Sequence, residues 1–100
     1  MKTKLTHNDI IKLLKTEKQY IIDKYGVTEI GLFGSFASGT PNEGSDIDLL
    51  ISFKEPSFEY LAGLTIFLES KFNRKIEIVR KSENIKSRFL QRIEDTVVYV

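Results

Sequence analysis

A glycine-rich segment between two strand-like runs constrains the fold of this chain more than any other feature. Residues 27–33 carry β-branched and aromatic side chains, and residues 47–53, with the sequence IDLLISF, form a mostly apolar run of strand length. The segment between them, GSFASGTPNEGS, is rich in the small residues that favour a loop or a short helical turn. A connection of this kind predicts that the two strands are neighbours and run antiparallel.

Hydrophobic periodicity predicts the remaining elements. Thr6, followed three residues later by Asp9, is a variant of the capping box that marks the start of a helix. The sequence KIEIVR alternates polar and apolar residues as a half-buried strand does. In chain order, the predicted elements are a helix over residues 7–24, a strand over 27–33, a strand over 47–53, a helix from Pro56-Ser57 to Phe72-Asn73, a strand over 75–80, a short helix containing Ile85, Phe89 and Ile93, and a terminal strand or extended tail over 97–100.

This order of elements predicts an α/β or α+β fold. We expect one small mixed β-sheet with helices packed mainly on one of its faces. A helix links the strands over 47–53 and 75–80, and this crossover permits either direction for the second strand. The chain has 100 residues, of which 41% are hydrophobic, so we expect one globular domain over residues 1–100. The phenylalanines of the second long helix are expected in the core: Phe58, Phe67 and Phe72.

Gly34 and Ser35 follow the first predicted strand and form a candidate phosphate-binding turn. Glycine adopts backbone angles that other residues avoid, so the main-chain N–H groups around Ser35 can approach a phosphate. The serine hydroxyl can donate one further hydrogen bond. A Gly-Ser pair by itself is more often a simple turn at the end of a strand. Its interpretation as a phosphate site therefore depends on the residues that follow.

Asp46 and Asp48 follow Ser35 after an interval of ten residues. At positions i and i+2 of a strand, both carboxylates lie on one face while Ile47 points to the other. Two carboxylates so placed repel each other unless a cation neutralises them, and Mg²⁺ prefers carboxylates supplemented by water and phosphate oxygens. The chain has no cysteine and one histidine, so any metal must be held by oxygen. A phosphate-binding turn beside this pair predicts phosphoryl or nucleotidyl transfer.

Glu77 is a candidate third carboxylate. It stands between Ile76 and Ile78 in the sequence KIEIVR, so its side chain should project from the opposite face. On a strand next to Asp46 and Asp48, it could bridge a second Mg²⁺ ion or act as a base toward an attacking hydroxyl. The alternative is an ordinary exposed strand residue. A Glu77 side chain that points away from the two aspartates would exclude the shared role.

The run GLFGSFASGTPNEGSDIDLLISF, with KIEIV after the intervening helix, resembles the minimal nucleotidyltransferases of the DNA polymerase beta superfamily. The pattern of that family is Gly-Ser, ten residues and Asp-x-Asp, and the resemblance covers most of the chain. Small stand-alone members are similar to antitoxins of two-gene modules whose toxin is a HEPN ribonuclease. The resemblance implies a Mg²⁺-dependent protein adenylyltransferase that transfers AMP from ATP to a tyrosine hydroxyl of a HEPN toxin encoded by a neighbouring gene, and thereby silences the toxin.

The resemblance also implies a role for each candidate residue at its matching position. These roles are triphosphate binding by Gly34 and Ser35, binding of two Mg²⁺ ions by Asp46 and Asp48, and a third catalytic, metal-binding carboxylate at Glu77. Two positions depart from the family pattern, because members commonly have arginine at the position of Ser38 and aspartate at that of Glu77. Serine cannot supply the charge of arginine, whereas glutamate keeps the carboxylate on a longer side chain.

Other functions fit parts of the sequence. A non-catalytic antitoxin that neutralises its toxin by direct contact would accommodate the departures at Ser38 and Glu77. A transferase for a small hydroxylated molecule or an RNA end usually has a second domain for its acceptor, so we expect another molecule to present the acceptor. A net charge of +1 gives little reason to expect nucleic acid as a direct substrate.

Two further expectations concern membrane association and the position of the one histidine. No apolar run approaches the roughly 18 residues of a membrane span, and the first residues lack the apolar core of a signal peptide. We therefore expect a cytoplasmic protein without membrane association. His7, the one histidine, stands near the start of the first helix and is expected at the surface.

Overall fold

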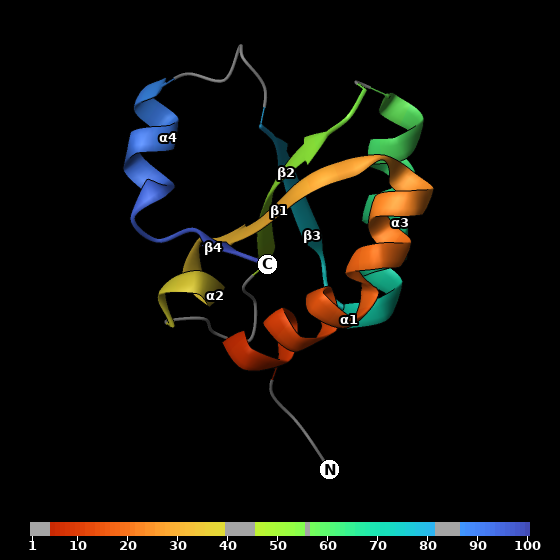
Figure 1. The fold of residues 1–100 in the computed structure, drawn as a ribbon. Helices are drawn as coiled ribbons and strands as arrows, with labels where there is room; N and C mark the ends of the chain where they lie inside the picture. The colour runs from red at the N-terminus through yellow and green to blue at the C-terminus, as the bar shows by residue number, and fades with distance from the viewer. Residues whose placement is uncertain (1–4, 40–45, 56, 82–86) are drawn as a thin grey trace.

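The computed structural model describes residues 5–39, 46–55, 57–81 and 87–100. Its elements, shown in Figure 1, are α1 (His7–Tyr25), β1 (Val27–Phe33), α2 (Ser35–Ser38), β2 (Ile47–Phe53), α3 (Phe58–Phe72), β3 (Ile76–Arg80), α4 (Ser87–Glu94) and β4 (Val98–Tyr99). Every predicted element is present, and the segment after β1 begins with the short helical turn α2. Pro56 and Ile85, which the predicted helices included, lie outside the described residues.

The strands form a mixed four-stranded sheet in the order β3-β2-β1-β4. β1 and β2 are antiparallel, as their connection predicted. β2 and β3 are parallel, which settles the direction that the sequence left open. β4 pairs with β1 in antiparallel fashion on the other side. The predicted fold class, a small mixed sheet with helices, is confirmed.

Helix α1 begins at the predicted capping box. The Thr6 hydroxyl accepts a hydrogen bond from the N–H group of Asp9 at 3.2 Å, and the Asp9 carboxylate accepts one from the N–H group of Thr6 at 2.9 Å. Gly26 ends the helix with a φ of 66°, the left-handed conformation that glycine adopts without a steric penalty. Between these caps, the residues that α1 buries in the core are Ile10, Leu14, Ile21 and Tyr25.

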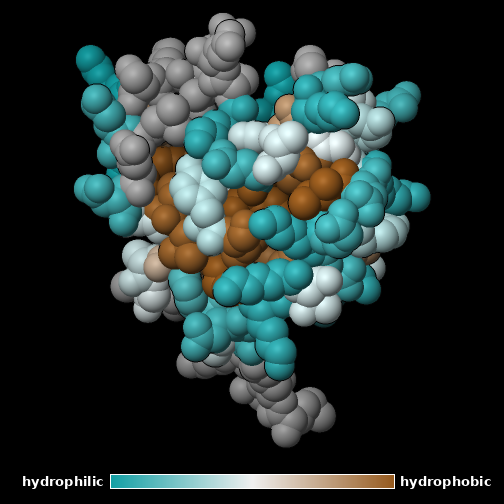
Figure 2. Space-filling model, viewed as in Figure 1, coloured by the Kyte–Doolittle hydropathy of each residue, from teal (hydrophilic) through white to brown (hydrophobic). Residues whose placement is uncertain are grey.

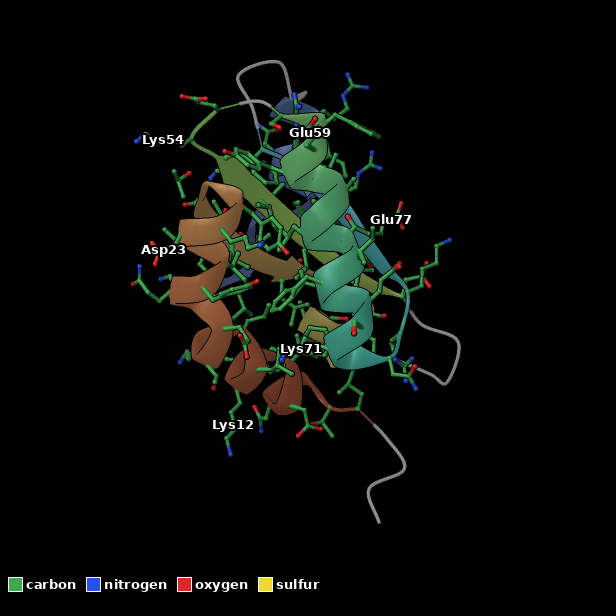
Figure 3. The ribbon with its side chains drawn as sticks, turned by 90° about the vertical axis from the view of Figure 1, so that its right-hand side faces the viewer. Lys12, Asp23, Lys54, Glu59, Lys71 and Glu77 are labelled. Atoms are coloured by element: carbon green, nitrogen blue, oxygen red, sulfur yellow. The ribbon has the colours of Figure 1, made fainter. Side chains whose placement is uncertain are left out.

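The core lies between the sheet and the two long helices. Alternate residues of β2 are at most 1% exposed and share the core cluster with Leu64 and Leu68 of α3; they are Ile47, Leu49 and Ile51. Figure 3 shows α1 and α3 side by side in front of the sheet. The expectation that helices cover mainly one face is therefore confirmed for the two long helices. Because successive strand residues point to opposite faces, Asp48 belongs to the other face.

Helix α4 lies on the opposite side of the sheet from α1 and α3 (Figure 1). Its Phe89 contacts Phe33 of β1 edge to face, with the ring centroids 6.0 Å apart. The C-terminal segment lies over Gly31, where an added β-carbon would come within 3.0 Å of the Tyr99 ring and 2.7 Å of the Val97 side chain. The absence of a side chain at Gly31 thus lets the terminal strand pack closely on β1.

The expectation that Phe58 belongs to the core is wrong. Phe58 is 80% exposed, whereas Phe67 is partly buried and Phe72 is 9% exposed. Phe58 is the first residue of α3, directly after the N-cap Ser57, and the fully buried residues of the helix begin only at Leu64. The first turns of α3 therefore extend beyond the core, although their hydrophobic spacing continues that of the buried face.

Hydrophilic residues surround apolar residues in the view of Figure 2, and the apolar residues gather across its middle. The exposed large hydrophobic side chains among the described residues are Tyr20, Phe58, Tyr60, Ile66 and Tyr99. Within the same ranges, no helix combines the length and the hydropathy required to cross a membrane.

Candidate functional site

The pairing of three strands brings the predicted site residues to one end of the sheet. The antiparallel pairing of β1 and β2 places Phe33 opposite Asp48. The parallel pairing of β2 and β3 places Asp48 opposite Glu77. Gly34 and Ser35 follow directly after Phe33. The glycine turn and the carboxylates, which come from three separate segments of the sequence, are therefore neighbours in the fold.

Gly34 lies against the carboxylate of Asp48. Its backbone has a φ of 78° and a ψ of −155°, a conformation that residues with a side chain rarely adopt. A β-carbon at Gly34 would lie 3.1 Å from Cγ of Asp48 and would collide with Oδ2 of the same carboxylate. Both the backbone angles and the contact therefore require glycine at this position.

Ser35 begins the short helix α2, for which Gly34 is the N-cap. The carbonyl oxygen of Gly34 accepts hydrogen bonds from the N–H groups of Ala37 and Ser38, both at 3.1 Å. The first N–H groups of a helix have no acceptor within the helix, so those of Ser35 and the next residue can meet a phosphate oxygen. The Ser38 hydroxyl donates to the carbonyl oxygen of Ser35 at 3.2 Å. The side chain that stands where the family commonly has arginine thus turns back onto α2.

The Asp48 carboxyl has an unfavourable environment for its negative charge. Burial raises its pKa above the ordinary value, and the charges of Glu77 and then of Asp46 raise that pKa further. Glu77 and Asp46 are thus both close enough to Asp48 to act on its carboxylate electrostatically. A cation placed among them would relieve this repulsion, and a donor set of carboxylate oxygens suits Mg²⁺.

The carboxylates differ in one respect from the predicted three-ligand site. Among the described residues, no three histidine, cysteine, aspartate or glutamate side chains are close enough together to hold one metal ion. The predicted convergence of Asp46, Asp48 and Glu77 into one ligand group is therefore not observed. Glu77 is exposed on the edge strand β3 and lies at the margin of the molecule in Figure 3.

Two residues that the sequence analysis did not connect with the site contact α2. His7 was expected at the surface, but it is half-buried, and its Nδ1 atom lies 2.8 Å from the carbonyl oxygen of Phe36. The guanidinium of Arg74 lies 5.3 Å from the centroid of the Phe36 ring. No local sequence signal indicates these contacts, because the partners are far apart in the chain. They meet because α1 and the turn between α3 and β3 both pack beside α2.

Sequence comparisons match nearly the whole chain. The family model described as a nucleotidyltransferase domain matches residues 10–100. A relative from Thermococcus cleftensis, the protein adenylyltransferase MntA, is 36% identical over 97 residues. The match covers 96% of this chain and 97% of the relative, so the two proteins correspond over their lengths.

Two solved structures share the fold. One, described as a candidate minimal nucleotidyltransferase, has a TM-score of 0.80 at 21% sequence identity, and the match covers 97% of this chain and 98% of that one. The other is a complex of a tri-AMPylated HEPN toxin of Shewanella oneidensis with an MNT antitoxin. Its TM-score is 0.57 at 20% identity, and the match covers 93% of this chain and 66% of that one. At these identities, the likeness establishes the fold.

Proposed function

This chain belongs to the family of nucleotidyltransferase domains, and on that basis we propose that it transfers AMP from ATP to a hydroxyl group of a partner toxin. The observation that carries the proposal is the contact between Gly34 and Asp48. It brings a turn suited to phosphate oxygens against a carboxylate suited to a divalent cation. Nucleotidyl transfer requires both features at one place.

The relatives support an adenylyl group and a toxin as acceptor. MntA of Thermococcus cleftensis, to which the chain is similar over nearly its whole length, is a protein adenylyltransferase. The MNT antitoxin of similar fold forms a complex with a HEPN toxin that carries AMP groups. By analogy, the partner of this chain is a HEPN-type ribonuclease toxin encoded by a neighbouring gene, and the acceptor is a tyrosine hydroxyl.

We assign phosphate binding, metal binding and proton transfer to different residues of the site. The Ser35 hydroxyl and the N–H groups at the start of α2 hold the triphosphate. Asp46, Asp48 and Glu77 would hold two Mg²⁺ ions, which supply positive charge to the phosphate oxygens. The acceptor oxygen bonds to the α-phosphorus while the bond to the β-phosphate breaks and pyrophosphate leaves. The hydroxyl proton passes to a carboxylate, and Glu77, the most exposed of the three, is our candidate for this base.

A non-catalytic antitoxin is the second candidate function. The uncharged Ser38 side chain bonds back to the Ser35 carbonyl oxygen, so it adds no positive charge to a triphosphate. Glu77 is exposed at the sheet edge rather than gathered with the two aspartates into one ligand group. A protein with a weak nucleotide site would neutralise its toxin by contact alone.

Incubation with labelled ATP, Mg²⁺ and the product of the neighbouring gene tests the proposal. Mass spectrometry of the partner should show added AMP with the wild-type protein and none with Asp48→Asn. Asp23→Asn is a matched control, because Asp23 is exposed on α1, away from the site (Figure 3), and this variant should transfer AMP normally. If the partner is inhibited without added AMP, and Asp48→Asn inhibits it equally well, the binding function is correct and AMP transfer is not.

A further inference from the structure

His7 and Phe36 join two segments of the chain that meet beside the candidate phosphate-binding turn. Figure 1 shows the start of α1 next to α2. The Nδ1 atom of His7, the first residue of α1, lies 2.8 Å from the carbonyl oxygen of Phe36, which is 29 residues further along the chain. Phe36 directly follows Ser35, so the contact lies one residue away from the turn.

The direction of this hydrogen bond follows from its acceptor. A carbonyl oxygen can only accept, so Nδ1 of His7 must carry the hydrogen. The separation of 2.8 Å lies within the usual range for an N–H group and a carbonyl oxygen. The contact therefore selects the ring form with a hydrogen on Nδ1 over the neutral form that has its hydrogen on Nε2.

Both partners of the bond are held in place by other contacts. The capping box of Thr6 and Asp9 fixes the first turn of α1, which begins with His7. The Phe36 side chain is 1% exposed in the core, and the Arg74 guanidinium lies over its ring at 5.3 Å from the centroid. The fold itself therefore sets the distance between the imidazole and the Phe36 carbonyl oxygen.

Helix α2 depends on such support because it is only four residues long. A single helical turn fixes several backbone dihedral angles in exchange for few hydrogen bonds, so it is not stable by itself. A hydrogen bond from His7 to the Phe36 carbonyl oxygen opposes rotation of this turn. It thereby maintains the direction of the N–H groups at Ser35 and Phe36.

We propose that His7 is a positioning residue that holds the Gly34-Ser35 turn in the conformation that binds nucleotide phosphates. This inference rests on the proposed function, which assigns the phosphates to that turn. His7 acts through the Phe36 carbonyl oxygen. Loss of the bond should weaken ATP binding about fivefold, which corresponds to one ordinary hydrogen bond. We expect a raised KM for ATP at a nearly unchanged kcat, which is the kinetic pattern of weakened ground-state binding.

Three substitutions separate the hydrogen bond from the size of the side chain. The amide nitrogen takes the place of Nδ1 in His7→Asn, but that of Nε2 in His7→Gln. Calorimetric titration with ATP and Mg²⁺ should therefore give near-normal affinity for His7→Asn and about fivefold weaker affinity for His7→Gln and His7→Ala. Ile21→Val, a buried change in the same helix, is the control, since it should lower the melting temperature without weakening ATP binding.

The ring of His7 provides a second measurement that does not depend on the ligand. The chain has one histidine, so its ring signals need no further assignment. A long-range proton-nitrogen correlation spectrum of the protein without nucleotide should show a hydrogen on Nδ1. A neutral ring with its hydrogen on Nε2 would overturn the inference whether or not the protein binds ATP.

Measurements of ATP binding and of AMP transfer together distinguish the positioning role of His7 from the proposed function. If the wild type binds ATP and modifies its partner, but all three variants bind ATP equally well, the positioning role is wrong and the proposed function stands. If the affinities follow the expected order but the partner gains no AMP, the positioning role stands and AMP transfer is wrong. A wild-type protein that binds no ATP would contradict both.

Discussion

Gly34 and Asp48 lie so close together that a β-carbon at Gly34 would be 3.1 Å from Cγ of Asp48. They come from different parts of the sheet, since Gly34 follows β1 and Asp48 is the second residue of β2. The candidate phosphate-binding turn and the candidate metal ligand are therefore in direct contact. A change in either residue alters the surroundings of the other.

Gly34→Ala should abolish AMP transfer and destabilise the fold. The new methyl group would collide with Asp48, and a φ of 78° is strained for alanine. We expect a loss of about 2–4 kcal/mol in the free energy of unfolding by urea. Gly39→Ala is the matched control, because Gly39 has a φ of 81° but no described residue lies within 4 Å of an added β-carbon. It should lose only about 1 kcal/mol and retain transfer. Equal losses in the two variants would show that the contact with Asp48 is unimportant.

Asp48→Asn should raise the melting temperature of the protein without nucleotide or Mg²⁺, although it abolishes AMP transfer by removing a proposed metal ligand. Burial, Glu77 and Asp46 raise the pKa of Asp48, so the fold disfavours its charged form. Asparagine removes the charge at nearly the same shape, and we expect a rise of roughly 2–4 °C in a thermal melt. The exposed Asp23→Asn should change the melting temperature by less than about 1 °C. A fall for Asp48→Asn would contradict this electrostatic account.

Lys81 should stabilise the packing of the C-terminal strand in a pH-dependent manner. The Lys81 ammonium donates hydrogen bonds to the Glu29 carboxylate at 2.9 Å and to the Tyr99 hydroxyl at 3.3 Å. Both bonds raise the pKa of Lys81, and the bond to Glu29 has the larger effect. The contribution is therefore complete below the ordinary lysine pKa of about 10.4 and is lost as the pH rises through the higher value of the folded state. The side chains of Lys81 and Glu29 are 34% and 41% exposed, so solvent screens the ion pair. We therefore expect it to add only about 0.5 kcal/mol to the free energy of unfolding.

Urea unfolding of Lys81→Gln measures this contribution. The variant should be less stable than the wild type at neutral pH, and the difference should disappear at a pH above the raised pKa of Lys81. Lys12→Gln, a change at an exposed position of α1, should match the wild type at both pH values. A difference that persists at high pH would assign the effect to packing of the lysine side chain rather than to its charge.

Phe58 should contribute almost nothing to stability in spite of its size. It is 80% exposed, so Phe58→Ala should change the free energy of unfolding by less than about 0.5 kcal/mol. Leu64→Ala in the same helix removes a side chain that is 0% exposed and should cost about 2–5 kcal/mol. Urea unfolding of the two variants provides the comparison. A large loss for Phe58→Ala would mean that Phe58 packs in solution.

The sequence by itself determined the elements of this protein and the chemistry of its site. The capping box of Thr6 and Asp9 predicted the start of α1, and the structure contains both of its hydrogen bonds. The alternation of Asp46, Ile47 and Asp48 predicted a buried isoleucine between two carboxylates, and Ile47 is 0% exposed. These signals are local, because caps and strand alternation depend on residues only a few positions apart.

The tertiary structure alone decided which of these parts meet. The parallel direction of β3 places Glu77 opposite Asp48, and the packing of α1 beside α2 brings His7 to Phe36. The same packing leaves Phe58 exposed although its spacing fits the buried face of α3. Strand register and helix packing arise from contacts between residues far apart in the chain. Short-range patterns do not contain these contacts, so the sequence could supply the carboxylates and the glycine turn but not their arrangement.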